Sequence, residues 1–377
     1  MSSSQVLYTK IIGTLSSLVS VSHIAQMKNW VWIVVGILQA QSVALPKIAV
    51  HIPGQVQAES RLTTIRRWLK NLKVDVWGFY QPVLEHALQG WRTVEAIVIL
   101  DGVMVFGDRL QIFRLSLVHG RRAIPLTWKV IPGKGLTQVE RLAAMLTQAA
   151  EFLRPRVKRG CFLADRGFRD CDWAQLCREL GWHYAIRVPC NTTVKLQNGQ
   201  ERRIDELGVR PGQRYYFQKV SLTHKATLCA NLSVTWTEGD DKHPPELLAV
   251  ISDRRACYTR LTEYSLRMDI EESFRDDKSG GFDLAHTRLQ HAERLERLLL
   301  AVAIATLWCH ELGEHVLAQG EACRREIDPG PQRELSIFQL GLRWLKRCIS
   351  VAIHRLPPFL ARLTPIRLQP VVQAGKP

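Results

Sequence analysis

The chain has 377 residues, enough for two or three domains with a sizeable core. Its 51 Lys and Arg against 35 Asp and Glu give a net charge of +16, which favours a polyanionic partner, either nucleic acid or an anionic membrane, over a merely basic soluble protein. The longest apolar runs, at 30–38 and 298–309, are shorter than the roughly 18 residues of a spanning helix, which argues against a membrane protein. Nine cysteines without a CxxC pair argue against disulfides and a zinc site and favour a reducing compartment.

Residues 1–90 are predicted to be helical, because apolar residues recur there at helical spacing. Within them, 42–72 reads as a short helix, a Pro-Gly turn and a second, basic helix that carries Arg61, Arg66, Arg67 and Lys70. A helix-turn-helix places such a second helix on DNA. An ordinary basic surface helix explains this stretch equally well.

The pattern changes at Thr93 to a β-rich one. Strands are expected over 94–106, 110–120, 123–131, 160–168 and 182–188, with helices over 135–153 and 172–180. This order predicts an α/β fold with a mixed sheet flanked by helices. Residues 189–244 hold turn sequences between short β-type segments and are predicted to form a β-rich insertion, after which 246–252 returns to the main sheet or its edge. Residues 282–377 are expected to be helical.

The stretch HELGEH, residues 310–315, resembles a zinc-protease motif. Its histidines are five residues apart, which separates them by about 140° around a helix, whereas HExxH needs a shared face. A zinc site is therefore not expected here.

The charged stretch YSLRMDIEESFRDDK, residues 264–278, is predicted to be one helix that stops at the following Ser-Gly-Gly. Relative to Tyr264, a helical wheel places Arg267 at about −60°, Glu271 at about −20° and Lys278 at about −40°. Glu271 is thus the single carboxylate on a narrow stripe with an aromatic residue and two cations. A salt-bridged surface helix is the alternative explanation.

Two further acids, Asp101 and Asp165, stand at or near the ends of two predicted strands. A lone Asp there is commonly a turn residue or a helix cap, but two strand ends and one helix face can bring three carboxylates together. Converging carboxylates repel unless cations pair with them, and Mg²⁺ or Mn²⁺ are the natural partners. Two such ions about 4 Å apart can activate a water or a 3′-hydroxyl and stabilise the leaving oxygen in phosphodiester displacement.

At this point the sequence resembles the DDE transposases of bacterial insertion sequences, in the branch with a YREK signature (the insertion-sequence-four type). Tyr264, Arg267, Glu271 and Lys278 meet every spacing of that signature. LDGV around Asp101 and LADRGF around Asp165 resemble the family's first two acidic motifs, in the right order. One departure is Gly102, where the family usually has a hydroxyl residue after the first Asp.

The resemblance covers about residues 55–310 and implies an RNase H-like core with a β-rich insertion and a helical N-terminal DNA-binding region. The expected layout is an N-terminal DNA-binding region over 1–90, a catalytic core over 91–188 and 246–310 with the insertion at 189–245 between its parts, and a C-terminal helical region over 311–377 that could serve dimerisation. It implies cut-and-paste transposition by a homodimer on double-stranded DNA, at the terminal inverted repeats and in the target.

Residue by residue, the resemblance implies that Asp101, Asp165 and Glu271 are the ligands of two Mg²⁺ or Mn²⁺ ions. Tyr264, Arg267 and Lys278 would contact DNA phosphates near the cleaved end, in keeping with Arg forking a phosphate and Lys supplying a point charge.

Two further contacts complete the predicted site. Arg166, beside the second acid, is a candidate phosphate contact, although such an Arg often pairs with a neighbouring carboxylate. Members of the branch can cleave through a DNA hairpin with one base flipped onto an aromatic side chain, for which Trp236 is the candidate. A Trp packed in the insertion's own core is the alternative.

The expected function is therefore a DNA transposase acting in the bacterial cytoplasm in association with the nucleoid. A catalytically silent, transposase-derived DNA-binding protein and an RNase H-like nuclease without strand transfer are the alternatives. The intact acids and stripe argue against the first alternative, and the basic N-terminal region and the insertion argue against the second.

Overall fold

The computed structural model describes residues 1–133, 139–168, 171–222, 228–237, 244–276, 280–284 and 287–365. Its N-terminal part is helical, as expected, because each helix there buries an apolar stripe against its neighbours. These helices are α1 (Ser3–Leu18), α2 (Ile24–Ala40), α3 (Leu45–Val50), α4 (Ala58–Lys70) and α5 (Val76–Ala87). Helices α3 and α4 are the short helix and the basic helix predicted over 42–72, with Gly54 at a positive φ of 129° in the turn between them.

A mixed sheet follows, and its first five strands have the order β3-β2-β1-β4-β5. β2 is antiparallel to β1 and β3, whereas β4 is parallel to both β1 and β5. This strand order and these directions are those of an RNase H-like sheet, so the predicted fold class is confirmed. The strands are β1 (Glu95–Val105), β2 (Leu110–His119), β3 (Arg122–Pro132), β4 (Arg159–Ala164) and β5 (His183–Val188).

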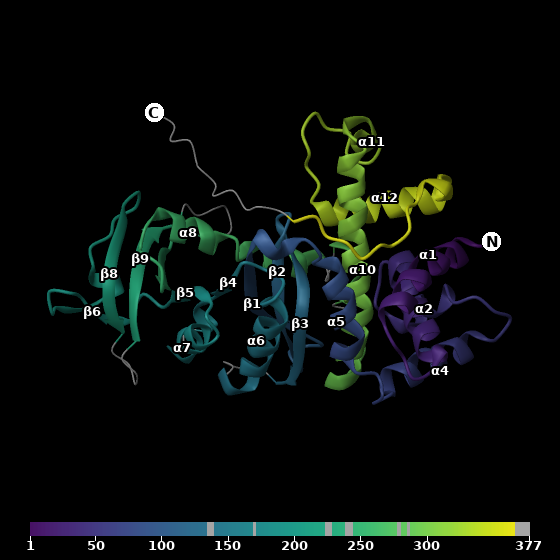
Figure 1. The fold of residues 1–377 in the computed structure, drawn as a ribbon, viewed down its shortest axis with the longest axis horizontal. Helices are drawn as coiled ribbons and strands as arrows, with labels where there is room; N and C mark the ends of the chain where they lie inside the picture. The colour runs from purple at the N-terminus through teal and green to yellow at the C-terminus, as the bar shows by residue number, and fades with distance from the viewer. Residues whose placement is uncertain are drawn as a thin grey trace.

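The β-rich segment after β5 continues the same sheet. β10 pairs antiparallel with β5, and β9 pairs with β10, so that the sheet extends through the order β10-β9-β8-β6-β7 to ten strands. Figure 1 shows these strands at the far left of the molecule, away from the N-terminal helices. The strands are β6 (Thr193–Lys195), β7 (Glu201–Arg203), β8 (Arg214–Leu222), β9 (Leu228–Trp236) and β10 (Leu247–Ser252).

The long helix α10 (Ala292–Ala318) joins the sheet to the N-terminal helices. It packs against β3 on one side and against α2 and α4 on the other, and in Figure 1 it stands upright between the sheet and the N-terminal helices. Its apolar residues are buried nearly all round, since partners lie on both sides. The other helices are α6 (Val139–Leu153), α7 (Cys171–Glu179), α8 (Tyr258–Ser265), α9 (Met268–Arg275), α11 (Glu321–Arg325) and α12 (Ile337–Val351). Short 3-10 turns occupy Trp91–Thr93, Arg166–Phe168, Ile204–Glu206 and Ile353–Arg355.

The predicted single helix over 264–278 is wrong in one respect, because two helices, α8 and α9, meet at Leu266 and Arg267. Both residues keep right-handed helical dihedral angles. The backbone bonds across the junction run from residue i to i−3, for example from the N–H of Arg267 to the carbonyl of Tyr264 at 2.9 Å. The helix therefore tightens by a 3-10 turn instead of ending.

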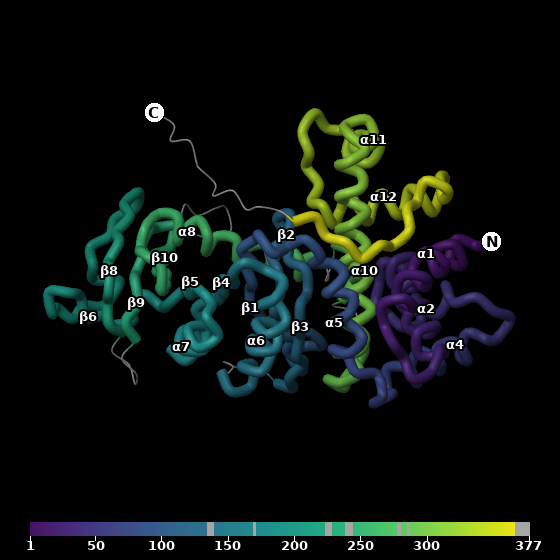
Figure 2. Tube along the Cα trace, in the orientation of Figure 1, coloured from purple at the N-terminus to yellow at the C-terminus, as the bar shows by residue number. Residues whose placement is uncertain are grey.

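The expectation of helix throughout 282–377 is also wrong for the last described residues. After α12 the chain forms an extended strap over 356–365 that returns along α10 and the N-terminal helices, as the yellow tube in Figure 2 shows. The acids of the HELGEH stretch hold this strap: Glu311 accepts the N–H groups of Leu360 and Ala361, and Glu314 accepts that of Thr364. These carboxylates thus have structural partners in the strap.

Among the described residues, no helix is both long enough and apolar enough to cross a membrane. The two apolar runs noted in the sequence are buried parts of α2 and α10. All nine cysteines lie among the described residues, and none of them forms a disulfide there.

Candidate active site

The three predicted acids reach one cavity from three different elements. Asp101 lies in β1, and Asp165 follows the last residue of the parallel strand β4. The pairing of Leu100 with Ala164 places these two acids at the next step of the same register. Glu271 approaches from α9. All three line an open cavity of about 410 Å³, together with Gly102, Val103, Arg267, Phe274 and Arg275.

Helix α9 is held in place by its buried face. Ile270, Ser273 and Phe274 are buried against the sheet, and the guanidinium of Arg114 on β2 lies 4.2 Å from the ring centre of Phe274. Ser273 accepts the backbone N–H of Ala123 in β3 at 2.7 Å. Because the apolar face of α9 is fixed in this way, Glu271 is turned to the cavity.

A second polar anchor joins α9 to the sheet. Arg122, at the start of β3, donates to the carboxylate of Asp276 at 2.8 Å and lies 3.6 Å from Glu272. Neither Ser273 nor Arg122 was predicted from the sequence to belong to the site. In the sequence, Ser273 is a polar residue on the apolar face of an amphipathic helix, and Arg122 is a basic residue at the start of a strand. Neither pattern predicts a contact unless the fold is known.

Arg267 stands among the acids. One of its guanidinium nitrogens lies 3.1 Å from Asp101, and another binds Glu271. The side chain of Arg267 is only 9% exposed, compared with 19% for Asp101 and 42% for Glu271. A buried cation therefore compensates the charge of two of the three carboxylates in the absence of other cations.

Tyr264 completes the contacts of the stripe. Its hydroxyl donates to Asp165 at 3.4 Å, and burial raises the pKa of this phenol, so that it remains a neutral donor. Arg267 and Glu271 thus line the acidic cavity, whereas Tyr264 contacts one of its acids without lining it. Lys278, the last residue of the stripe, lies outside the described residues.

The electrostatics of Asp101 suit a site for cations. Burial raises the pKa of this carboxyl to about 6, although Arg267 and the N–H of Gly102 lower it, and the charges of Glu271 and Asp165 raise it further. A positive ion would offset the repulsion that these two negative charges exert on Asp101. Three carboxylates offer hard oxygen ligands, so the residues present fit Mg²⁺ or Mn²⁺.

A different group brings its ligand atoms closer together. Glu95, Cys161 and Glu263 place one ligand atom each within 4.8 Å of one another, and they were not predicted from the sequence. The guanidinium of Arg254 already lies among them, 2.9 Å from Glu95 and 3.0 Å from the sulfur of Cys161, and it also pairs with Glu263. This cluster is accordingly neutralised by an arginine and is a structural ion-pair network.

The departure at Gly102 has a steric explanation. A Cβ atom at this position would lie 2.9 Å from the ring of Phe113 and 3.1 Å from the amide of Gln111, both on β2. Phe113 in turn packs edge-on against Phe168, just after Asp165. Glycine therefore lets the phenyl ring fill the space beside the first acid.

The basic residues of the predicted basic helix, α4, have different contacts. Arg61 donates to the backbone carbonyl of Ile52 at 2.9 Å and so stabilises the turn before α4. Arg66 and Lys70 line a second cavity beside α10, which Arg67 does not. All of these except Arg61 are exposed.

The two remaining candidates have protein partners. Arg166 lies 3.8 Å from Glu246 and is 59% exposed. Trp236 ends β9, where it is half-buried, and its indole N–H donates to the carbonyl of Val209 at 2.7 Å. Neither residue lines the cavity of the three acids.

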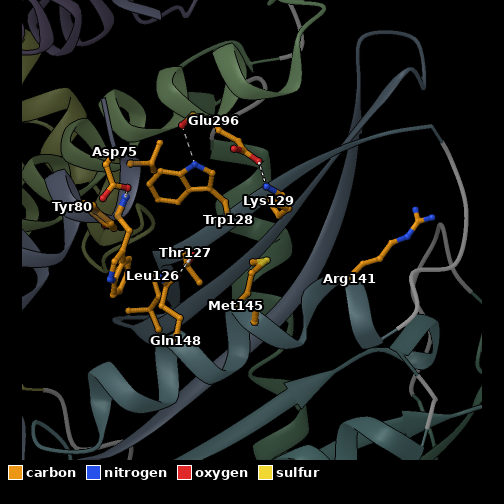
Figure 3. A pocket seen from close by; sticks show the side chains of 13 residues that line it. Asp75, Tyr80, Leu126, Thr127, Trp128, Lys129, Arg141, Met145, Gln148 and Glu296 are labelled. Atoms are coloured by element: carbon orange, nitrogen blue, oxygen red, sulfur yellow. Dashed lines mark hydrogen bonds and ion pairs between the residues drawn. The ribbon is translucent and has the colours of Figure 1, made fainter. Parts of the chain in front are cut away.

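Another cavity, of about 350 Å³, lies between α5, β3, α6 and α10 (Figure 3). Its polar groups bind one another: the indole of Trp128 donates to the carbonyl of Glu296 at 3.0 Å, and Lys129 pairs with the Glu296 carboxylate at 3.5 Å. Thr127 donates to Gln148 at 3.4 Å. The polar groups of this cavity thus join β3 to α6 and α10. The acidic cavity remains the candidate active site.

Comparison with known families points to the same part of the chain. Residues 137–308 match the family model described as the transposase DDE domain. This segment is somewhat less than half of the chain and includes Asp165, Tyr264, Arg267 and Glu271, whereas Asp101 lies before it. No curated protein matches the sequence.

Two solved structures are similar over much of the chain. The piggyBac transposase in a synaptic complex with hairpin DNA aligns at 9% identity and a TM-score of 0.46, covering 94% of this chain and 80% of that one. The Argonaute of Marinitoga piezophila, in complex with guide RNA and target DNA, aligns at 10% identity and a TM-score of 0.22, covering 67% of this chain and 34% of that one. Neither alignment is close enough to carry an argument about function. The family match by itself supports a DDE transposase domain within this chain.

Proposed function

We propose that this protein is a DNA transposase that cleaves the ends of an insertion sequence and joins the 3′-hydroxyl ends to target DNA by two-metal phosphodiester transfer. The observation that carries the proposal is the meeting of Asp101, Asp165 and Glu271, from β1, the end of β4 and α9, at one open cavity. The family match over 137–308 supports the same class of enzyme.

In this proposal the three acids hold two Mg²⁺ or Mn²⁺ ions. Such ions, when bound, activate the attacking water or 3′-hydroxyl and stabilise the leaving oxygen. The chain's own groups bind and orient the DNA. Arg267, already a buried guanidinium at the acids, offers a planar fork to a phosphate next to the scissile bond, and Tyr264 offers a neutral hydroxyl from the same side. Lys278, on the same stripe, is proposed as a further phosphate contact.

The finer assignment is to the YREK branch of the family. We infer a homodimer that acts on terminal inverted repeats and target DNA. In this homodimer, residues 1–90 would bind the transposon end, 189–245 would form the insertion, and 311–377 would serve dimerisation. Arg166 would add a phosphate contact. A place in the bacterial cytoplasm at the nucleoid follows from the substrate.

We further propose that the second strand is cleaved through a DNA hairpin. Trp236 is the candidate platform for a flipped base, and Trp236→Ala should reduce hairpin formation more than first-strand nicking. The substitution also removes the bond from the indole to the carbonyl of Val209. An equal loss of both reaction steps would therefore assign Trp236 to the packing of the insertion.

The decisive experiment compares Glu271→Gln with Glu272→Gln. Glu271→Gln keeps the size of the side chain but removes the charge of a metal ligand, so cleavage of a labelled end duplex should fall by orders of magnitude while binding in a mobility-shift assay survives. The wild type should require Mg²⁺ or Mn²⁺ and stay inactive in Ca²⁺, whose longer and looser coordination fits the displacement badly.

Glu272 is a matched control on the next position of α9. It pairs with Arg275 at 2.9 Å, is one-third exposed and lies 3.6 Å from Arg122, which keeps its closer partner Asp276 at 2.8 Å when Glu272 is replaced. The loss of Glu272 should therefore cost no more than about 1 kcal/mol of stability and leave cleavage nearly normal. An active Glu271→Gln beside an inactive Glu272→Gln would refute the assignment of α9. A wild type that binds the end but cuts with no metal would establish the catalytically silent DNA-binding protein instead.

A further inference from the structure

A basic groove lies apart from the acidic cavity, between the N-terminal helices and the start of α10. Its volume is about 870 Å³, and α4 packs along α10 beside it, at the lower right of Figure 1. Leucines from α3, α4 and the segment before α10 form its floor. Its charged lining consists of five permanent cations and one carboxylate, together with a histidine: Lys47, Arg66, Lys70, Arg288, Arg294, Asp283 and His291.

The cations of this groove are available to a ligand. Among the described residues, Lys70, Arg288 and Arg294 form no ion pair and no side-chain hydrogen bond. Lys47 is 62% exposed and reaches Asp283 only at 3.8 Å. Arg66 pairs with Glu59, but both side chains are more than half exposed, so that this contact is weak and easily exchanged.

A neighbouring arginine shows the contrast. Arg297, one turn after Arg294 on α10, is buried and donates to the backbone carbonyls of Leu69 and Glu293 at 3.0 and 3.1 Å. Arg297 therefore holds α10 to the end of α4, whereas Arg294 has no structural partner in the described part of the chain and turns to the groove.

The groove is tied to the chain that leaves the catalytic helix. The N–H of Val43 donates to the carbonyl of Phe282 at 2.8 Å, and the hydroxyl of Ser42 donates to Asp283 at 3.2 Å. The segment that follows α9 is thus bonded to the residues that lead into α3, which forms one wall of the groove. A polyanion held in the groove would be positioned by the same segment that continues from Glu271.

We propose that this groove binds a phosphodiester backbone of duplex DNA, with Lys47, Arg66 and Lys70 on one wall and Arg288 and Arg294 on the other. Arg66 and Lys70 stand one helical turn apart, about 6 Å along α4, so the two can face successive phosphates of one strand. Five cations against one carboxylate leave four net positive charges on the groove, which complements a polyanion and no neutral ligand. The inference rests on the proposed function, since it gives that DNA substrate a second contact surface.

The test uses the full-length protein and a fluorescein-labelled duplex of arbitrary sequence, in Ca²⁺ to prevent cleavage. The variant is Arg288→Ala/Arg294→Ala. Each phosphate contact contributes about 0.9 to the slope of log K against log salt, so the double variant should lower the slope by about 1.8 and weaken binding by between about 10-fold and 60-fold at 0.1 M salt.

The charge-matched control is Arg154→Ala/Lys158→Ala. Both residues are exposed and precede β4, at the opposite end of that strand from Asp165. Binding and slope should stay at wild-type values in this control. Equal behaviour of the two double variants would overturn the groove while leaving the proposed function intact. A wild type that binds no duplex at all would overturn both proposals together.

Discussion

Replacing Arg267 by Met tests whether this residue neutralises the acidic cavity. The substitution keeps an unbranched apolar stem but removes the cation that lies 3.1 Å from Asp101 and also binds Glu271. Asp101 is 19% exposed, and removing one partner of a buried pair typically costs about 3–5 kcal/mol. Glu271 is 42% exposed, so solvent screens its pair and adds about 1 kcal/mol at most.

We therefore expect the metal-free variant to lose about 3 kcal/mol of unfolding free energy near pH 8, or roughly 4 °C in Tm for a chain of 377 residues. The loss should shrink towards about pH 5, because the pKa of Asp101 is already about 6 and a protonated carboxyl needs no counterion. The sign follows from the raised pKa: the folded variant binds a proton that the unfolded chain has released, so its stability falls as the pH rises.

The assay is thermal unfolding of both proteins in EDTA and then in Mn²⁺. A Mn²⁺ concentration of 100 times the wild-type Kd adds about 2.7 kcal/mol to the wild type. At that same concentration the gain should be larger in the variant, because its carboxylates no longer share a guanidinium and bind the ion more tightly. Arg275→Met is the control, since Arg275 lines the same cavity but is 70% exposed and pairs with Glu272 at the surface. A variant as stable as the wild type near pH 8, or one with the same deficit at both pH values, would refute the reasoning.

Three further predictions concern other positions. Gly102→Ser should destabilise the protein by about 1–3 kcal/mol in urea unfolding, because the new Cβ meets the ring of Phe113 at 2.9 Å. Adding Phe113→Leu should restore part of the lost stability. A Gly102→Ser variant as stable as the wild type would contradict the steric argument. Burial raises the pKa of Glu311 from 4.5 to about 8, so the folded state keeps a proton that the unfolded chain releases, and stability falls as the pH rises from about 4.5 to about 8. The Tm of Glu311→Gln should therefore exceed that of the wild type by a margin that grows over this range and is constant above it, whereas parallel Tm curves would count against this origin. Arg66→Ala should weaken duplex binding and lower the salt slope of log K more than Arg67→Ala does, because Arg66 lines the groove and Arg67 does not. Equal effects of the two substitutions would remove that distinction.

The order of the core elements could be predicted from the sequence because it depends on local patterns. Apolar runs and their periodicity predicted β1 to β5 with α6 and α7 to within a few residues at most boundaries. The spacing of the stripe predicted that Glu271, and neither Glu272 nor Asp269, would face the cavity, since the register around a helix is fixed by 3.6 residues per turn.

Other features depended on contacts between distant segments. The tightened turn at Arg267 and the continuation of the sheet through β10 into the insertion have no local signal. The extended strap after α12 is held by Glu311 and Glu314, which were noticed in the sequence only as part of a motif that they do not form.

The sequence by itself determined which residue types the site contains and on which side of their own elements they stand, because these follow from local periodicity. Only the tertiary structure decided what they do to one another. The parallel register of β1 and β4 brings Asp101 level with Asp165, and burial makes Arg267 the counterion of Asp101 and Glu271. Distances between strands and the loss of solvent around a charge arise from packing across the whole chain, and these two quantities set both the cavity and the raised pKa of Asp101.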